Sequence, residues 1–303
     1  MSSDALEALI AGKRARPYSS DQTVEELRRE TEARIDANPM PPEVRCEAVN
    51  GNDVPMEWIQ MPDVDTDRVF YFIHGGGYYR GTVATSRSPA AELSRNCAAR
   101  TLSVDYRLAP EHPFPAAIDD VLAGYRWLLG QGVDPRNVVV GGISAGGGLT
   151  AALLLALKRA GDPLPAGAVP LSPWMDLTQG GASYRTRAAE DPIISKAYLD
   201  RMAAYYLAGQ DPRNPLASPL FGELAGLPPM LLQVGTAETL LDDSVAFAHR
   251  AREAGVDVRL EQWEGLVHGW HGFPQLPETH EAMARIGAFC REVMGDHDDT
   301  RQR

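Results

Sequence analysis

Asn137-Val138-Val139-Val140-Gly141-Gly142-Ile143-Ser144-Ala145-Gly146-Gly147-Gly148-Leu149 is the stretch that decides the fold of this chain. Its three consecutive valines are typical of a buried strand, and the alanines and leucines of residues 151–158 are typical of a helix packed on a sheet. Between them, Gly-x-Ser-x-Gly is the pattern of a strand that turns so sharply into a helix that only small neighbours fit beside the serine. The serine hydroxyl then stands above the sheet at a helix N-terminus, which favours developing negative charge. The stretch therefore predicts an α/β protein with Ser144 as a candidate nucleophile.

The alternative interpretation of this stretch is a plain glycine-rich turn or a phosphate-binding loop with an incidental serine. No lysine follows the glycines, and no Gly-x-Gly-x-x-Gly spacing fits. Nucleotide binding is therefore disfavoured, whereas the five-residue pattern alone leaves a plain turn open.

Length and charge restrict the remaining classes of protein. The 303 residues are enough for one large α/β domain with a small accessory element, or for two modest domains. A formal net charge of −12 disfavours nucleic acid and anionic membranes as partners, because both favour clustered Lys and Arg. Residues 1–16 lack the pattern of a signal peptide, and no segment has the apolar length needed to cross a bilayer. We expect a cytoplasmic protein without stable membrane association, and the sequence leaves a homodimer open.

The cysteines point to no structural role. Cys46, Cys97 and Cys290 are widely spaced and odd in number, which is typical of neither a disulfide framework nor a zinc site. We therefore expect buried free thiols and no bound metal.

Periodicity predicts two short helices, a hairpin and then an alternating α/β region. Residues 4–13 and 23–37 have helical patterns, and residues 44–49 and 54–61 alternate around Asn50-Gly51-Asn52-Asp53 as in an antiparallel hairpin. From residue 68 onward, strand-like runs alternate with helical ones, which predicts a mostly parallel sheet with right-handed crossovers. The predicted strands are residues 69–73, 101–106, 138–143, 167–171, 230–234 and 258–263.

The interval from Asp176 to Leu220 departs from this alternation. Within it, one set of apolar residues falls at helical spacing, between clusters of Pro, Asn and Asp. These residues are Ile194, Tyr198, Met202 and Tyr205. We expect an insertion that covers part of the domain, and a disordered polar end at residues 296–303.

The tetrad His74-Gly75-Gly76-Gly77 directly follows the predicted strand 69–73. Glycines leave backbone N–H groups uncovered, so these groups can bind a developing oxyanion together with the N–H of Ala145. A plain glycine turn is the alternative, and a second acyl-transfer motif in the same chain disfavours it. We expect His74 to anchor this loop by hydrogen bonds rather than to act as a base.

A serine nucleophile of this kind needs a histidine base, which follows it in chain order. His268 lies after the last predicted strand, and His271 is the close rival because sequence does not determine the register of a short loop. The other histidines come too early, in helical patterns or in the tail. We expect His268 to be the base.

The acid of such a triad ends the strand before that histidine. Glu238 comes just past the predicted strand 230–234, and Asp242 and Asp243 follow one turn later. A carboxylate in this place holds the imidazole in the right tautomer. The two aspartates fit the alternative of helix N-terminal carboxylates better, so we expect Glu238 to be the acid.

Four separated motifs together resemble the hormone-sensitive-lipase-like family of bacterial carboxylesterases, also called bacterial family IV. They are the tetrad at 74–77, Tyr-Arg-Leu-Ala-Pro-Glu-x-x-Phe-Pro-Ala at 106–116, Gly-x-Ser-Ala-Gly-Gly at 142–147, and the Glu238/His268 pair. The resemblance runs from about Arg68 to the last helix. It implies an α/β-hydrolase fold, with a mostly parallel central sheet flanked by helices and a helical cap. By the same resemblance, residues 1–42 and about 176–220 form the cap, the latter inserted in a catalytic domain of residues 43–303.

The resemblance also implies an oxyanion hole formed by Gly76 and Gly77, with Gly75 adjacent, and by Ala145. Most relatives carry Asp before the nucleophile and Asp-Pro-Leu at the acid, whereas this chain has Ile143 and Glu238-Thr239-Leu240. A subgroup of the family shares both changes, so they are coherent with each other. For Arg107 and Glu111 in the second motif we expect a structural ion pair.

The implied activity is hydrolysis of short- to medium-chain carboxylic esters by a Ser-His-Glu triad, without a cofactor. An amidase, a thioesterase or a lactone hydrolase could use the same site. A ligand-binding protein that has lost catalysis is a further alternative, which the intact Ser144 and His268 disfavour. Side chains of the cap and neighbouring loops are candidates for an apolar substrate pocket, or simply for packing between cap and core. They are Tyr78, Tyr79, Trp174, Tyr198, Met202 and Tyr205.

Overall fold

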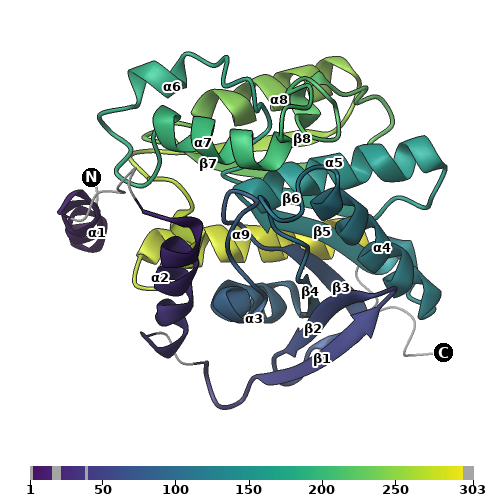
Figure 1. Ribbon diagram of the computed structural model, residues 1–303. Helices are drawn as coiled ribbons and strands as arrows, with labels where there is room; N and C mark the ends of the chain where they lie inside the picture. Colours follow the sequence, from purple (N-terminus) through teal and green to yellow (C-terminus); the bar gives the residue numbers. More distant parts are fainter. Residues whose placement is uncertain (1–2, 16–21, 38–39, 296–303) are drawn as a thin grey trace.

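The computed structural model describes residues 3–15, 22–37 and 40–295 (Figure 1). In this part of the chain, one eight-stranded sheet has the strand order β1-β2-β4-β3-β5-β6-β7-β8. The strands are β1 (Arg45–Gly51), β2 (Val54–Gln60), β3 (Asp65–Ile73), β4 (Ala99–Val104), β5 (Val138–Ile143), β6 (Gly167–Leu171), β7 (Met230–Gly235) and β8 (Val258–Trp263). The polar end predicted to be disordered, residues 296–303, lies outside the described residues.

The sheet is mostly parallel, as predicted. β1 and β2 form the expected antiparallel hairpin and β2 pairs antiparallel with β4, whereas every pairing from β4 to β8 is parallel. Parallel strands in one sheet place their carboxyl ends at the same edge. The loops that follow β3, β5, β6, β7 and β8 therefore gather at one edge of the sheet.

Helices cover both faces of the sheet (Figure 1). They are α1 (Asp4–Arg14), α2 (Val24–Ala37), α3 (Arg87–Cys97), α4 (Ala116–Gly130), α5 (Ala145–Ala160), α6 (Ser183–Thr186), α7 (Lys196–Leu207), α8 (Leu241–Glu253) and α9 (Pro277–Met294). Successive side chains of a strand point to opposite faces. On β3, Tyr71 and Ile73 accordingly pack with residues of α4, α5 and α8, and Phe70 and Phe72 pack with residues of α3 and α9. Burial on both faces explains why the central strands are continuous apolar runs.

The two predicted N-terminal helices are present as α1 and α2. Thr23 and Glu26 form a capping box at the start of α2: the N–H of Thr23 donates to the Glu26 carboxylate at 2.8 Å, and the N–H of Glu26 donates to Thr23 Oγ1 at 3.2 Å. Figure 1 shows both helices outside the sheet, and α6 and α7 of the insertion along another border of the domain. The Arg201 guanidinium of α7 donates to the Gln22 carbonyl, which connects the insertion to the segment that precedes α2.

The prediction of buried cysteines is correct for Cys97 and Cys290 and wrong for Cys46. Cys97 and Cys290 join α3 to α9, with 3.2 Å between the two Sγ atoms. Cys46 lies on β1, an outer strand of the sheet whose side chains are mostly exposed. The alternation of apolar and polar residues in this segment predicts a strand, but it does not predict whether helices cover that strand.

Candidate active site

Ser144 lies at the turn between β5 and α5, with a strained backbone (φ 60°, ψ −118°). The two motif glycines explain how β5, α5 and β3 approach so closely. A Cβ on Gly146 would lie 2.1 Å from the Ile73 carbonyl oxygen, and one on Gly142 would lie 2.4 Å from the same atom. Only glycine fits at either place, so the Gly-x-Ser-x-Gly pattern follows from packing against the end of β3.

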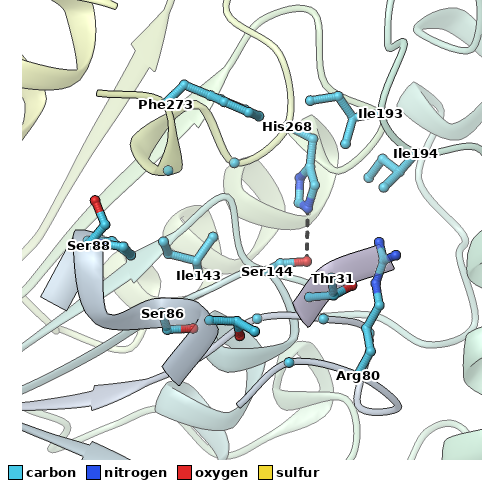
Figure 2. Close-up of a pocket in the computed structure, with 18 of the residues that line it drawn as sticks. Thr31, Arg80, Ser86, Ser88, Ile143, Ser144, Ile193, Ile194, His268 and Phe273 are labelled. Carbon is cyan, nitrogen blue, oxygen red and sulfur yellow. Dashed lines mark hydrogen bonds between the residues drawn. The ribbon is translucent and has the colours of Figure 1, made fainter. Parts of the chain in front are cut away.

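The structure brings Ser144, His268 and Glu238 into one chain of hydrogen bonds (Figure 2 shows the first link). His268 Nε2 lies 2.9 Å from Ser144 Oγ, and His268 Nδ1 lies 2.9 Å from Glu238 Oε2. With Nδ1–H donating to the carboxylate, Nε2 is free to accept from the serine hydroxyl. The imidazole therefore has the tautomer that a general base requires.

Glu238 is fully buried, and its second oxygen is held by two further donors. Oε1 accepts from the Ser172 hydroxyl at 2.7 Å and from the Gly235 N–H at 2.6 Å. Ser172 directly follows β6, and its own Oγ accepts from the Gly269 N–H at 3.3 Å. Loops after three neighbouring strands thus fix the orientation of this carboxylate.

The surroundings of His268 favour its protonated form. Burial lowers the pKa of this imidazole, but the hydrogen bond to Glu238 and the negative charges of Glu238 and Asp191 outweigh burial and raise the pKa above its usual value. Asp191 lies in the insertion and is itself buried. A proton taken from a bound hydroxyl would therefore be stabilised on this ring.

The rivals for the base and the acid have other partners. His271 Nε2 lies 3.1 Å from Gln233 Oε1, and burial together with the nearby His268 lowers the pKa of His271 to about 3. Asp242 accepts from the Ser183 N–H at 2.9 Å. Asp243 accepts from the Met175 and Asp176 N–H groups at 2.8 and 2.9 Å. Both aspartates hold the insertion against the start of α8.

Two elements beside Ser144 carry backbone N–H groups that are candidates for an oxyanion hole: the loop after β3 and the start of α5. The loop after β3 turns through Gly76 (φ 121°) and Gly77 (φ 60°), and a Cβ on Gly75 would lie 2.8 Å from the Ile143 carbonyl oxygen. Among the described residues, no backbone carbonyl accepts from the N–H of Gly76, Gly77 or Ala145. Ala145 is the first residue of α5, where an N–H has no partner within the helix. These three groups are free to bind an oxygen beside Ser144.

The second sequence motif supports this loop from behind. The Tyr106 ring stacks on His74 with 4.2 Å between the ring centroids, and its hydroxyl donates to the His74 carbonyl at 3.0 Å. His74 Nδ1 lies 2.8 Å from the Gly75 carbonyl oxygen. His74 thus lies within the packing of the loop and away from Ser144.

The expected ion pair between Arg107 and Glu111 is wrong. Arg107 pairs with Asp120 at 2.7 Å, and Glu111 pairs with Arg28 of α2 at 2.7 Å. The docking of α2 beside this loop supplies a partner that is distant in sequence, which no local pattern indicates.

A cavity of about 750 Å³ opens above Ser144 and His268. Three of the six candidate pocket residues, Trp174, Tyr198 and Met202, line it. The other three pack behind these residues: Tyr78 stacks on Tyr206, the Tyr79 hydroxyl lies 2.7 Å from the Tyr198 hydroxyl, and Tyr205 lies beside Tyr79. For them the packing alternative describes the structure better.

Comparison with known proteins places this geometry in a family. Residues 70–272 match the family model described as an alpha/beta hydrolase fold. A solved esterase from the bacterial hormone-sensitive lipase family is 46% identical and superposes with a TM-score of 0.94, over 97% of this chain and 100% of that one. This chain belongs to the bacterial hormone-sensitive-lipase-like family.

Curated relatives of this hormone-sensitive-lipase-like chain agree on the type of reaction. An acetyl-hydrolase of Streptomyces hygroscopicus is 46% identical over 241 residues, which are 79% of this chain and 80% of the relative. An esterase of Acinetobacter venetianus is 36% identical over 260 residues, 84% of each protein. As a member of this family, the chain is a carboxylic ester hydrolase.

The structure adds residues to the cavity that the sequence analysis did not name as pocket candidates. Ile193, Ile194 and Phe273 form apolar walls of the cavity, and Thr31 and Arg80 are polar groups in it (Figure 2). Ser172 could have been found, because it follows a predicted strand whose end meets the nucleophile. The others come from loops and helices without a motif. Within the described residues, none of the helices combines the length and apolar character that a membrane crossing requires.

Proposed function

We propose that Ser144, His268 and Glu238 form the catalytic triad of this esterase, with Gly76, Gly77 and Ala145 as the oxyanion hole and Gly75 adjacent. The hydrogen-bond chain from Ser144 through His268 to Glu238, with 2.9 Å at each step, carries this proposal. The N–H groups of Gly76, Gly77 and Ala145, which donate to no backbone carbonyl in the described part of the chain, support the second part.

In the proposed reaction, Ser144 Oγ attacks the ester carbonyl while His268 Nε2 takes the hydroxyl proton. The carbonyl oxygen becomes an oxyanion, which the N–H groups of Gly76, Gly77 and Ala145 stabilise. His268 then gives its proton to the leaving alcohol, which produces an acyl-enzyme. Water, deprotonated by the same imidazole, attacks the acyl-enzyme and releases the carboxylic acid. Glu238 stabilises the imidazolium in both steps.

We also propose that residues 1–42 and about 176–220 form a cap that limits the substrates to short- and medium-chain esters. Thr31 of α2, Ile194 just before α7, and Met202 of α7 line the cavity over Ser144. A cavity volume of about 750 Å³ suits a small ligand. The rest of the chain, residues 43–303 without the insertion, is the catalytic domain.

Substitution Ser144→Ala tests the triad. We expect the variant to keep its circular dichroism spectrum and to lose at least about 10⁴-fold in kcat for p-nitrophenyl acetate, because the nucleophile is gone. Activity within a few-fold of the wild type would exclude the serine mechanism.

A series of p-nitrophenyl esters with lengthening acyl chains, together with lactones, thioesters and amides, tests the substrate class. Faster hydrolysis of a lactone or an amide than of any ester would replace the proposed substrate.

A further inference from the structure

Arg80 places a guanidinium in the cavity above Ser144 and His268. Figure 2 shows its side chain extending from the loop after β3 toward the part of the cavity where Thr31 and Ile194 lie. Among the described residues, no side chain or carbonyl forms an ion pair or a hydrogen bond with the guanidinium of Arg80. Its contacts are with two aromatic rings: its Cζ lies 5.4 Å from the ring centroid of Tyr79 and 5.8 Å from that of Tyr198.

The other charged side chain in the lining is neutralised. Arg87 donates two hydrogen bonds to the Glu57 carboxylate, at 2.8 and 2.7 Å. The lining residues of the cavity include no aspartate or glutamate. Across the outer groove that Arg80 also lines, Glu30 accepts a hydrogen bond from Gln22. Among the lining residues that the structure describes, Arg80 is therefore the cationic side chain that no carboxylate pairs with, since Arg87 is paired with Glu57 and His268 with Glu238.

The position of Arg80 is coupled to the reacting groups through one tight turn. The Arg80 N–H donates to the Gly76 carbonyl at 3.2 Å, so the backbone of Arg80 is fixed relative to the N–H groups proposed to bind the oxyanion. The two tyrosine rings beneath the guanidinium stabilise the cation without using its N–H donors. Those donors remain available for a ligand, and a guanidinium fits a carboxylate with two parallel hydrogen bonds.

We propose that Arg80 is a specificity-determining residue that selects esters carrying a second, free carboxylate. This inference rests on the proposed function, because it assumes that the ester carbonyl is bound beside Ser144. The carboxylate belongs to either the acyl or the alcohol part of the ester, at the end of a short chain that spans from the carbonyl to the guanidinium. Half-esters of dicarboxylic acids and acetylated hydroxy acids are the two substrate types with this chemistry.

Two pairs of esters of similar size test the inference and separate the two sources of the carboxylate. Monoethyl adipate against ethyl hexanoate examines the acyl part, and 4-acetoxybutanoate against butyl acetate examines the alcohol part. The measured quantity is the ratio of kcat/KM, anionic over neutral ester, obtained by titrating the released acid. We expect Arg80→Met to lower this ratio at least about tenfold for one pair, because a charge-assisted hydrogen bond is lost. Arg80→Lys should retain part of the preference for the anionic ester, since the positive charge remains but the two parallel N–H donors of the guanidinium are lost.

Arg159→Met is the matched control, because it removes the same charge from an exposed residue at the far end of α5, about 20 Å along the helix from Ser144. Its ratios should equal those of the wild type. If Arg80→Met leaves both ratios at their wild-type values, the inference is overturned. Loss of ethyl hexanoate hydrolysis in Ser144→Ala shows separately that Ser144 is required for the proposed reaction. Full hydrolysis by Ser144→Ala would instead overturn the proposed function, and with it the premise of the Arg80 proposal.

Discussion

The three residues of the proposed triad lie in loops directly after parallel strands, whereas the helices around the cavity are held by a few side chains. Ser144 follows β5, and Glu238 is bonded to the last residue of β7 through the Gly235 N–H. In contrast, Arg28 holds α2 by bonds to the Tyr79 and Ala109 carbonyls and to Glu111. The position of a loop at a strand end is fixed by the backbone pairing of the sheet, which does not depend on one side chain. A helix held by side-chain bonds can be released by one substitution. We infer that the reacting groups tolerate little change and that the cavity wall is the adjustable part.

After the loss expected for Ser144→Ala, the largest effect is expected for the acid of the proposed triad. Glu238→Gln should lower kcat by roughly 10³- to 10⁴-fold, because an amide does not fix the required tautomer and does not stabilise the imidazolium. Asp242→Asn is the control, since Asp242 accepts from the Ser183 N–H, outside the triad. Steady-state kinetics with p-nitrophenyl acetate measure both. A larger loss for Asp242→Asn would transfer the role of the acid to Asp242.

The next effect concerns the packing beneath Ser144. Gly146→Ala should lower the free energy of unfolding by about 2–5 kcal/mol, because its Cβ would lie 2.1 Å from the Ile73 carbonyl oxygen. Gly12→Ala in α1 is the control, since a Cβ there meets no atom within 4 Å. Denaturant unfolding of the two variants measures the difference. Equal free energies of unfolding for the two variants would mean that the end of β3 accommodates an added methyl group as easily as the surface of α1 does.

A smaller effect is expected when α2 is released from the domain. Arg28→Met removes the ion pair with Glu111 and the bonds to two carbonyls. We expect KM to rise by about three- to tenfold with kcat nearly unchanged, because α2 lines the cavity but holds no reacting group. Arg29→Met, at an exposed position of the same helix, should leave both parameters as they are. A fall in kcat without a change in KM would show that α2 acts on the chemistry instead.

The smallest effect is expected on the pH dependence of kcat/KM, through Asp191, which connects the cavity wall to the proposed triad. Its carboxylate accepts from the Ile193 and Ile194 N–H groups of the wall and from the Thr239 N–H beside the proposed acid. The base acts when unprotonated, so kcat/KM should fall as pH drops through the pKa of His268, which lies above the usual 6.5.

Asp191→Asn removes one negative charge that raises this pKa, so the acid limb of the profile should move to lower pH. Glu190→Gln is the control, because Glu190 pairs with Arg187 at the surface. A pH profile of kcat/KM with a neutral ester measures the shift. An unmoved acid limb would mean that Asp191 acts only as a structural link.

The sequence by itself determines the features that depend on local backbone geometry. Gly142 and Gly146 predict the strained turn because no other residue fits against β3, and the carboxyl ends of predicted parallel strands locate Glu238 and His268 in chain order. The β1–β2 hairpin follows from alternation around a turn sequence. Each of these signals consists of residues that are close together in the chain, so the sequence alone contains it.

Only the tertiary structure decided which distant residues meet. Arg107 and Glu111 have separate partners because α2 brings Arg28 beside the second motif, and Cys46 is exposed because it lies on the outer strand β1, where most side chains face the solvent. The place of the Arg80 guanidinium in the cavity, with no ion pair to any residue that the structure describes, is likewise decided by tertiary structure. Whether a charge is neutralised depends on every element packed around it, and that information is spread over the whole chain.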